Sequence, residues 1–232
     1  MKRLCTILAR GGSKGVLNKN IRDLNGKPLI AYTIRHAKES NLFDLVAVSS
    51  DSEEILRVAE QCGAGMIVKR PHELASDVAP KIPAIKHCLL EAEKRASCRY
   101  DVICDLDPTS PFRSLEDIRA CVELLESTGA QNVITGAPAR KSPYFNLVEV
   151  GRDGIAKLSK KLDQKIVRRQ DSPQCFDMNA SIYVWRRDDL LASDSVFLTK
   201  TLFYEMPRER SIEIDTEFDF EIASHFAKKG NL

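Results

Sequence analysis

The feature that most constrains this chain is a regular alternation of strand-like and helix-like segments over its first 138 residues. Short apolar runs rich in β-branched residues alternate with longer stretches that place apolar residues at helical spacing. The strand-like runs are 2–8, 45–50, 65–70, 101–107 and 132–138, and the helix-like runs are 27–40, 52–63, 81–96 and 114–129. Such alternation is typical of right-handed βαβ units. We therefore expect an α/β fold with a doubly wound, mostly parallel, Rossmann-like sheet and helices on both faces.

The alternation breaks between residues 140 and 179, where charged and turn residues dominate and no clear period remains. Strand signals return at 180–185 and 201–206, and 216–229 is predicted to close the chain as a helix. A long irregular segment in a compact chain is usually functional or an assembly element. We therefore expect one domain over 1–232 with an inserted arm at about 140–179.

Charge and cysteine content exclude several classes of protein. The 35 Lys and Arg residues nearly balance the 33 Asp and Glu residues, whereas nucleic-acid-binding domains usually carry a strong basic excess, so we expect no nucleic-acid partner. The seven cysteines show no CxxC spacing and no framework, which indicates reduced thiols and a cytoplasmic location. The N-terminal run LCTILA is too short for a signal-peptide core, and no segment approaches about 18 apolar residues, so we expect no membrane partner.

The stretch ILARGGSKGVLNKN, residues 7–20, places a glycine-rich turn and several cations directly after the first predicted strand. Backbone N–H groups and cations around one concavity suit a triphosphate. The glycines and cations concerned are Gly11, Gly12, Gly15, Arg10, Lys14 and Lys19. The loop is neither a Walker A loop nor a dinucleotide fingerprint, because GxxxxGK[ST] and GxGxxG are both absent. From this segment alone, a basic turn that merely reverses the chain remains an alternative.

Further motifs follow in a fixed order: KNIRDLNGKPLIAYTI, VSSDS, KRPHELASD, LDPTSPFR and SIEIDTEFDF. With these motifs the chain resembles the CMP-sialic acid synthetase (acylneuraminate cytidylyltransferase) family, which activates nine-carbon 2-keto sugar acids, the nonulosonic acids. The resemblance covers essentially the whole chain, and LARGGSKGVLNKN and RPHELASD are its most specific parts. No segment matches the VQGDEP-like motif of the related eight-carbon (KDO) cytidylyltransferases, which counts against KDO as the substrate.

The resemblance implies a reaction in which the anomeric 2-hydroxyl of the sugar acid attacks the α-phosphate of CTP and releases pyrophosphate. It implies CTP and a nonulosonic acid as substrates and Mg²⁺ as the cofactor. The attacking oxygen is a poor nucleophile and the triphosphate repels it, so catalysis would rest on positioning and charge neutralisation. One Mg²⁺ would hold the triphosphate, and a second could bind the sugar carboxylate.

The resemblance also implies roles for single residues. Arg10, Lys19 and Asp215 would be catalytic, with Lys19 stabilising the charge that grows on the α-phosphate. Glu213 and Asp215 would bind the metal; in a strand they would point to one face, although a solvated acidic edge strand is the alternative. Lys81 stands where small hydroxyl residues are usual, so its base contact stays open. The implied nucleotide-binding residues are Leu8, Ala9, Arg10, Gly11, Ser13, Lys14, Asn20, Arg70, Ala79 and Lys81.

On the sugar side the resemblance implies Asp107, Arg169, Asn179, Tyr183 and Phe197. Asp107 stands where sialic acid enzymes have a glutamine. Because a carboxylate prefers donors and repels another carboxylate, it favours a legionaminic acid over N-acetylneuraminic acid. Three alternatives stay open: Asp107 as a helix cap, Arg168 in place of Arg169 as the carboxylate ligand, and Phe197 as a core residue.

The arm also gains a meaning from the resemblance, which implies a homodimer whose exchanged arm completes the partner's sugar site. Two rival functions remain. One is a nucleotidyltransferase of the same fold that uses pseudaminic acid or KDO. The other is a catalytically silent nucleotide-binding module, which is disfavoured because Lys19 and Asp215 are both present.

Overall fold

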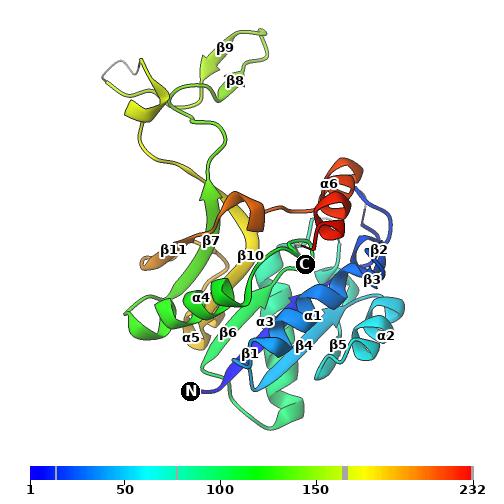
Figure 1. Ribbon diagram of the computed structural model, residues 1–232. Helices are drawn as coiled ribbons and strands as arrows, with labels where there is room; N and C mark the ends of the chain where they lie inside the picture. Colours follow the sequence, from blue (N-terminus) through cyan, green and yellow to red (C-terminus); the bar gives the residue numbers. More distant parts are fainter. Residues whose placement is uncertain (14, 77, 164–166, 231–232) are drawn as a thin grey trace.

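A seven-stranded sheet lies at the centre of the molecule in the computed structural model, which describes residues 1–13, 15–76, 78–163 and 167–230 (Figure 1). The strand order is β11-β7-β10-β6-β1-β4-β5, and among these strands β10 runs antiparallel to its two neighbours. The strands are β1 (Arg3–Leu8), β4 (Leu45–Ser50), β5 (Met66–Lys69), β6 (Val102–Leu106), β7 (Asn132–Pro138), β10 (Phe176–Arg186) and β11 (Thr201–Glu205). The predicted α/β fold with a mostly parallel sheet is confirmed.

Helices cover both faces of this sheet, as their amphipathic spacing predicts. α1 (Leu29–Glu39), α2 (Glu53–Gln61) and α4 (Leu115–Ser127) pack apolar side chains against one face. α3 (Lys81–Ala96) and the short α5 (Arg187–Ala192) pack against the other face. α3 has the bounds predicted from the sequence. α5 was not predicted, because its 6 residues form less than two turns and carry too little periodicity.

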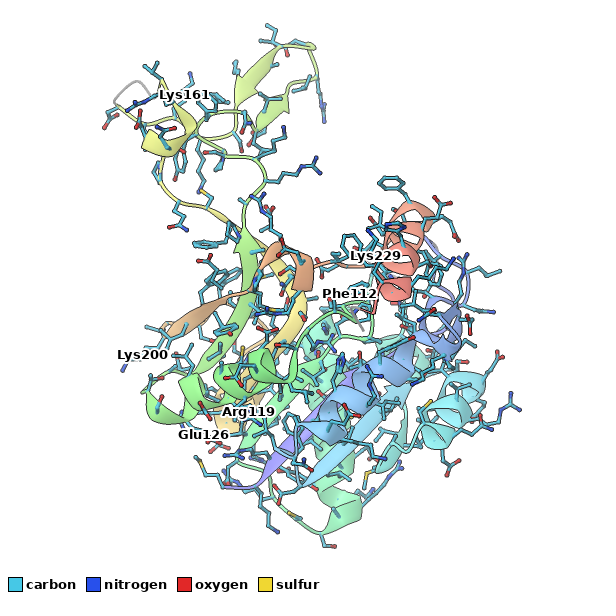
Figure 2. All side chains as sticks on the ribbon, in the orientation of Figure 1. Phe112, Arg119, Glu126, Lys161, Lys200 and Lys229 are labelled. Atoms are coloured by element: carbon cyan, nitrogen blue, oxygen red, sulfur yellow. The ribbon has the colours of Figure 1, made fainter. Side chains whose placement is uncertain are left out.

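A third, smaller core joins α6 (Glu217–Lys228) to the edge of the sheet where the parallel strands end. Phe112, labelled in Figure 2, packs edge-to-face against Phe226 of this helix, with ring centroids 6.2 Å apart. The same core buries Val16, from the loop after β1, and Ile214, from the segment before α6. It therefore holds two segments that are distant in the sequence at one edge of the sheet.

The structure corrects three expectations about element bounds. The helix expected at 27–40 begins at Leu29, because β3 (Lys27–Pro28) pairs with β2 (Asp23–Leu24) in a small hairpin. The segment 211–215 forms no strand, so the strand geometry expected for Glu213 and Asp215 is wrong. β10 begins at Phe176, which assigns residues 176–179 to the central sheet instead of the irregular segment.

Between β7 and β10 the chain leaves the sheet and forms a projection, here called the arm (residues 139–175). Figure 1 shows the arm standing out from the body beyond the end of β7, and the basic Lys161 lies on it, away from the sheet (Figure 2). Its hairpin consists of β8 (Val148–Val150) and β9 (Ala156–Leu158). Apolar side chains on this hairpin are exposed, among them Val150 at 65% and Ile155 at 55%.

Candidate active site

A cleft of ≈ 380 Å³ opens at the carboxyl ends of β1 and β6, beside the first turn of α3. In open parallel sheets this edge is where ligands bind. The cleft brings together most of the residues for which the sequence predicted a role in nucleotide binding or catalysis. The residues with these predicted roles that line it are Leu8, Arg10, Ser13, Lys19, Asn20, Arg70, Ala79, Lys81 and Asp215. Asp107, which was predicted to bind the sugar, lines the cleft as well.

The loop after β1 is fixed by polar contacts with neighbouring segments. Ala9 donates its backbone N–H to the carbonyl of Ser49 (3.0 Å), and Gly11 donates its N–H to Asp51 Oδ1 (2.8 Å). Asn20 donates its side-chain amide to the carbonyl of Arg10 (3.1 Å), which closes the loop on itself. Ala9 is fully buried and the Gly11 amide already has an acceptor, so these residues shape the loop in the structure. The predicted Lys14 lies outside the described residues.

The loop touches the segment before α6 at a position that only glycine can occupy. A Cβ added to Gly15 would lie 2.0 Å from the carbonyl oxygen of Asp215, far inside van der Waals contact. Lys19, which also belongs to the loop, contacts the same segment before α6. Its ammonium donates to the carbonyl of Ile214 (2.5 Å) and pairs with Asp215 Oδ1 (3.2 Å). A phosphate-type cradle and a candidate metal-binding carboxylate are therefore in direct contact.

Arg70 forms a buried part of the cleft lining, next to the loop after β1. Its guanidinium donates to the carbonyl (2.6 Å) and the hydroxyl (3.2 Å) of Ser49, and only 6% of the residue is exposed. Burial lowers the pKa of Arg70 below its usual value, although nearby acidic groups such as Asp51 oppose the shift. Arg70 thus presents a fixed positive charge at the end of β4.

Two carboxylates approach the cleft from the segment before α6 and differ in environment. Glu213 accepts the backbone N–H of Ala180 at 2.8 Å, and burial raises its pKa, assisted by the negative charges of Asp107 and Asp215. The side chain of Asp215 is 73% exposed and faces Lys19. A solvated acidic edge strand, the alternative for this segment, is wrong because Glu213 is partly buried and 211–215 is no strand.

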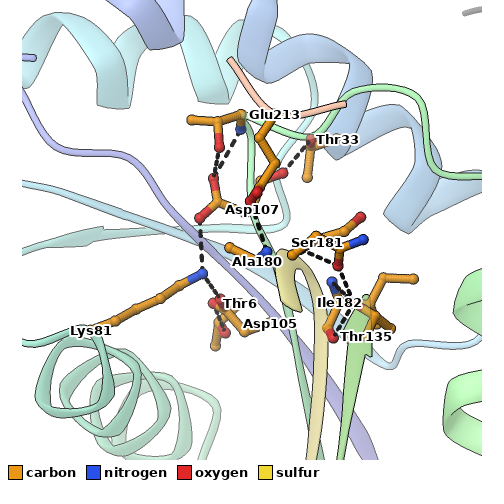
Figure 3. Close-up of polar contacts among 12 residues, drawn as sticks. Thr6, Thr33, Lys81, Asp105, Asp107, Thr135, Ala180, Ser181, Ile182 and Glu213 are labelled. Atoms are coloured by element: carbon orange, nitrogen blue, oxygen red, sulfur yellow. Dashed lines mark hydrogen bonds and ion pairs between the residues drawn. The ribbon is translucent and has the colours of Figure 1, made fainter. Parts of the chain in front are cut away.

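A lysine at the first position of α3 joins two aspartates on and after β6 (Figure 3). The ammonium of Lys81 lies 2.9 Å from Asp105 Oδ2 and 2.9 Å from Asp107 Oδ2. Asp107 Oδ1 accepts the backbone N–H (2.9 Å) and the hydroxyl (2.8 Å) of Thr109. The alternative of Asp107 as a helix cap is wrong, because Ser114 caps α4 in a capping box.

The sequence reasoning missed Asp105, Thr109 and Arg113. Arg113 is 2% exposed and donates to Ser181 Oγ (3.1 Å), to Thr33 Oγ1 (3.0 Å) and to the carbonyl of Asp107. One signal was available: an aspartate inside the otherwise apolar run VICDL has to find a buried partner. Nothing in the sequence showed that this partner would be Lys81.

Of the predicted sugar-binding residues whose side chains the structure describes, only Asp107 lines the cleft. Tyr183 lies beneath Lys81, whose ammonium is 5.0 Å from the ring centroid. Asn179 is buried and bonded, since Thr135 donates to its Oδ1 (2.5 Å) and its amide donates to Ser211 Oγ (3.0 Å). It sits where β10 shifts register against β7, a bulge of the kind common beside active sites.

The other two residues predicted to bind the sugar lie elsewhere. Phe197, 65% exposed on the connection to β11, does not line the cleft, and a core position for it is excluded. Arg169 belongs to a short 3-10 turn (Arg169–Asp171) on the arm, and its side chain lies outside what the structure describes. The neighbouring Arg168 pairs with Asp171 at 2.9 Å.

Among residues 1–13, 15–76, 78–163 and 167–230, no three His, Cys, Asp or Glu side chains gather closely enough to form a metal cage. Mg²⁺ seldom uses such a cage, because it keeps waters and substrate phosphates among its ligands. In the described part of the chain, no helix combines the length and apolar character needed to cross a membrane.

The family model described as cytidylyltransferase matches residues 4–229. Among curated proteins, the chain is 46% identical to post-translational flagellin modification protein B of Campylobacter coli and 43% identical to CMP-N,N'-diacetyllegionaminic acid synthase of Campylobacter jejuni. Each match covers 99% of this chain and 96% of the relative. It is 33% identical to N-acylneuraminate cytidylyltransferase of Escherichia coli, over 99% of this chain and 53% of that protein.

A solved structure agrees in fold. CMP:2-keto-3-deoxy-manno-octonic acid synthetase, determined in complex with CTP, superposes with a TM-score of 0.72 at 16% identity, covering 99% of this chain and 100% of that one. This likeness shows the fold alone. The match over 4–229, together with two relatives above 40% identity along nearly their whole length, shows that the chain belongs to the cytidylyltransferase family.

Proposed function

We propose that the protein transfers CMP from CTP to the anomeric 2-hydroxyl of a nine-carbon 2-keto sugar acid and releases pyrophosphate. The observation that carries this proposal is the contact of Lys19 with Asp215 in the cleft, because it joins a phosphate-type loop to a carboxylate. The names of the relatives support the same chemistry, since they include synthases of CMP-linked nonulosonic acids. The alternative of a catalytically silent nucleotide-binding module is disfavoured, because Lys19 and Asp215 are both present and in contact.

In this proposal the cations of the loop neutralise the triphosphate. Arg10 and Lys19, both in the lining of the cleft, would contact phosphate oxygens, and Lys19 would stabilise the charge that develops on the α-phosphate. Arg70, Ala79 and the first turn of α3 also line the cleft, and there the nucleoside would fit. The protein would contribute mainly position and charge, as is usual in phosphoryl-type transfers.

Asp215 and Glu213 suit a Mg²⁺ ion. Asp215 is exposed to the cleft, Glu213 lies two residues before it, and Mg²⁺ typically takes one or two carboxylates with substrate phosphates. When bound, the ion would supply further charge neutralisation for the triphosphate. Lys19 would then exchange its contact with Asp215 for a phosphate oxygen.

We further propose that the acceptor is of the legionaminic acid type. The chain is 43% identical to the diacetyllegionaminic acid synthase of C. jejuni, compared with 33% for the N-acylneuraminate enzyme of E. coli and 30% for a pseudaminic acid cytidylyltransferase of C. jejuni. Asp107 stands where sialic acid enzymes have a glutamine, and with Lys81 at 2.9 Å the position presents an ion pair in place of an amide.

A homodimer with an exchanged arm completes the proposal. The arm carries exposed apolar side chains and Arg169, which in a partner subunit would supply the cation for the sugar carboxylate. A cytoplasmic location fits the seven cysteines, all of which are free.

The test is pyrophosphate release by the purified protein with CTP and Mg²⁺, against N-acetylneuraminic, legionaminic, pseudaminic and KDO acids. We expect release that depends on CTP, on the metal and on one nonulosonic acid, with legionaminic acid the best substrate. Release with KDO alone would contradict the nine-carbon assignment. No release with any acid would contradict the proposed activity.

A further inference from the structure

Lys81 and Asp107 lie where the nucleotide side and the sugar side of the cleft meet. Lys81 begins α3, next to Ala79 and Pro80 in the wall assigned to the nucleoside. Asp107 follows β6, lines the cleft and is one of the residues assigned to sugar binding. Figure 3 shows the lysine reaching across to the aspartate, with Asp105 and Thr6 beneath. An ion pair thus joins two residues that sequence reasoning placed in separate subsites.

Neighbouring side chains fix both members of this Lys81–Asp107 pair in position. Asp105 is fully buried, accepts the hydroxyl of Thr6 at 2.7 Å and turns its other oxygen to Lys81. Asp107 has one oxygen occupied twice by Thr109 and the other occupied by Lys81. The side chains of Lys81 and Asp107 are 29% and 17% exposed, so each shows the cleft a small, fixed part of itself.

Both groups of the pair are charged in the folded protein. Burial alone would lower the pKa of Lys81, but the charges of Asp105 and Asp107 outweigh it and raise the pKa. Burial alone would raise the pKa of Asp107, but Lys81 and the Thr109 hydrogen bonds lower it. Asp107 therefore does not face the cleft as an isolated acid, since its charge is neutralised by a neighbour 2.9 Å away.

The remaining hydrogen-bonding capacity defines what the pair can recognise. A carboxylate oxygen accepts two hydrogen bonds and an ammonium donates three. Oδ2 of Asp107 retains one acceptor site. Lys81 donates one hydrogen bond to that oxygen and forms an ion pair with Asp105, so it retains donor capacity for a ligand. A donor and an acceptor side by side suit a hydroxyl, which accepts from Nζ and donates to Oδ2. They suit a second carboxylate or an ammonium poorly.

We propose that Lys81 and Asp107 act as a single specificity unit that binds a hydroxyl of the sugar acid, so that the residue at 81 determines how Asp107 contacts the acceptor. This inference rests on the proposed function. It differs from it in placing an acceptor-determining residue on α3, in the wall assigned to the nucleoside. Removing either member leaves the other without its partner, so their effects on acceptor binding should not be independent.

The experiment is a double-mutant cycle with Lys81→Gln, Asp107→Asn and the double variant. KM and kcat are measured for the sugar acid and for CTP by pyrophosphate release. We expect each single variant to raise the KM for the sugar acid by about 10-fold, and the double variant to raise it no further than the worse single variant. The KM for CTP should change by less than about 3-fold in all three. Multiplied losses, or losses confined to the KM for CTP, would overturn the inference.

A matched cycle on the same helix provides the control. Lys86 pairs with Asp194 at 2.7 Å outside the cleft, so Lys86→Gln and Asp194→Asn should leave both KM values unchanged. Because Lys81→Gln leaves Asp105 buried without its cation, Lys81→Arg is a second test that keeps the charge. It should raise the KM for the sugar acid at least about 3-fold with normal circular dichroism, and an unchanged KM would overturn the inference.

Failure of the inference differs from failure of the proposed function. If wild-type protein releases no pyrophosphate with any acid of the panel, the proposed function is wrong and the inference falls with it. If wild-type protein is active but the losses at 81 and 107 multiply, the proposed function stands and only the paired unit is wrong.

Discussion

Lys19 shows how a single residue obtains its role from a distant part of the chain. Its partner Asp215 lies 196 positions away in the sequence, and the two meet because Val16 and Ile214 pack in one small core. The side chain of Lys19 is 13% exposed, whereas that of Asp215 is 73% exposed. Lys19 is thus restrained while the carboxylate remains accessible.

Replacing Lys19 tests the assigned charge stabilisation. Lys19→Ala should lower kcat by about 10²–10³-fold, since one preorganised transition-state donor contributes that much. Circular dichroism should be unchanged. Lys27→Ala, on the exposed side of the β2–β3 hairpin, is the control and should keep full activity. Near-normal turnover of Lys19→Ala would show that the phosphate assignment is wrong.

Glu213 provides a prediction about pH. Because burial raises its pKa in the folded state, ionisation of Glu213 at neutral pH destabilises the fold, and this cost disappears once the carboxyl is protonated at low pH. Glu213→Gln should therefore raise the Tm at pH 7 in EDTA by roughly 1–2 °C and lose most Mg²⁺-dependent activity. The difference in Tm should vanish near the pH at which the carboxyl is protonated.

Thermal unfolding of both proteins over a series of pH values is the measurement. Glu205→Gln, an exposed side chain on β11, is the control and should leave the Tm unchanged throughout. A lower Tm for Glu213→Gln at pH 7 would mean that the hydrogen bond from Ala180 requires the charged form.

At the scale of elements, the loop after β1 and the segment 211–215 lie in contact and together form part of the candidate active site. Neither has regular strand or α-helix geometry, and both depend on the α6 core for their positions. The bulge in β10 next to Asn179 brings a third irregular segment to the same edge, where Ala180 bonds Glu213. The site is therefore built from the irregular ends of regular elements.

Gly15→Ala tests the junction between the loop and the carboxylate segment. The added Cβ would lie 2.0 Å from the carbonyl of Asp215, so one of the two segments has to move. A shift of this size should lower kcat/KM by about 10-fold or more, with a small effect on Tm. Gly129→Ala is the control, because a Cβ there meets nothing within 4 Å. Unchanged kinetics would show that the two segments need not touch.

At the scale of the whole molecule, the sheet and its helices hold the cleft, while the arm stands away from them (Figure 1). Among the five predicted sugar ligands, a first group, Asp107 and Tyr183, lies near the cleft, and a second, Arg169, lies on the arm. Asn179 is buried at the bulge of β10, and Phe197 lies away from the cleft. In the proposed dimer the arm of one subunit supplies the second group to the other.

Charging the arm hairpin tests this arrangement. Val150→Glu with Ile155→Glu replaces two exposed apolar side chains and should convert the dimer to a monomer in light scattering. CTP binding by calorimetry should persist, whereas turnover of the sugar acid should fall by at least about 10-fold. Leu90→Glu, also exposed but on α3, is the control and should remain dimeric and active. A wild-type protein that is already monomeric would contradict the homodimer.

The sequence by itself determined the layered α/β fold and most of the cleft. Periodicity predicted the order of strands and helices, and the motifs that carry the family resemblance supplied most of the residues that line the cleft. It did not determine the strand order, the antiparallel course of β10 or the irregular path of the segment 211–215, because these depend on which surfaces pack together.

Only the tertiary structure decided which charges are paired. Lys81, Asp105 and Asp107 lie on two elements whose approach no local pattern encodes, and their pairing turned a predicted isolated acid into half of an ion pair. Glycine is likewise required at position 15 because of the carbonyl of Asp215, which lies 200 positions further along the chain. Side-chain pairing depends on distances of a few ångströms between elements, and the packing of the cores sets those distances.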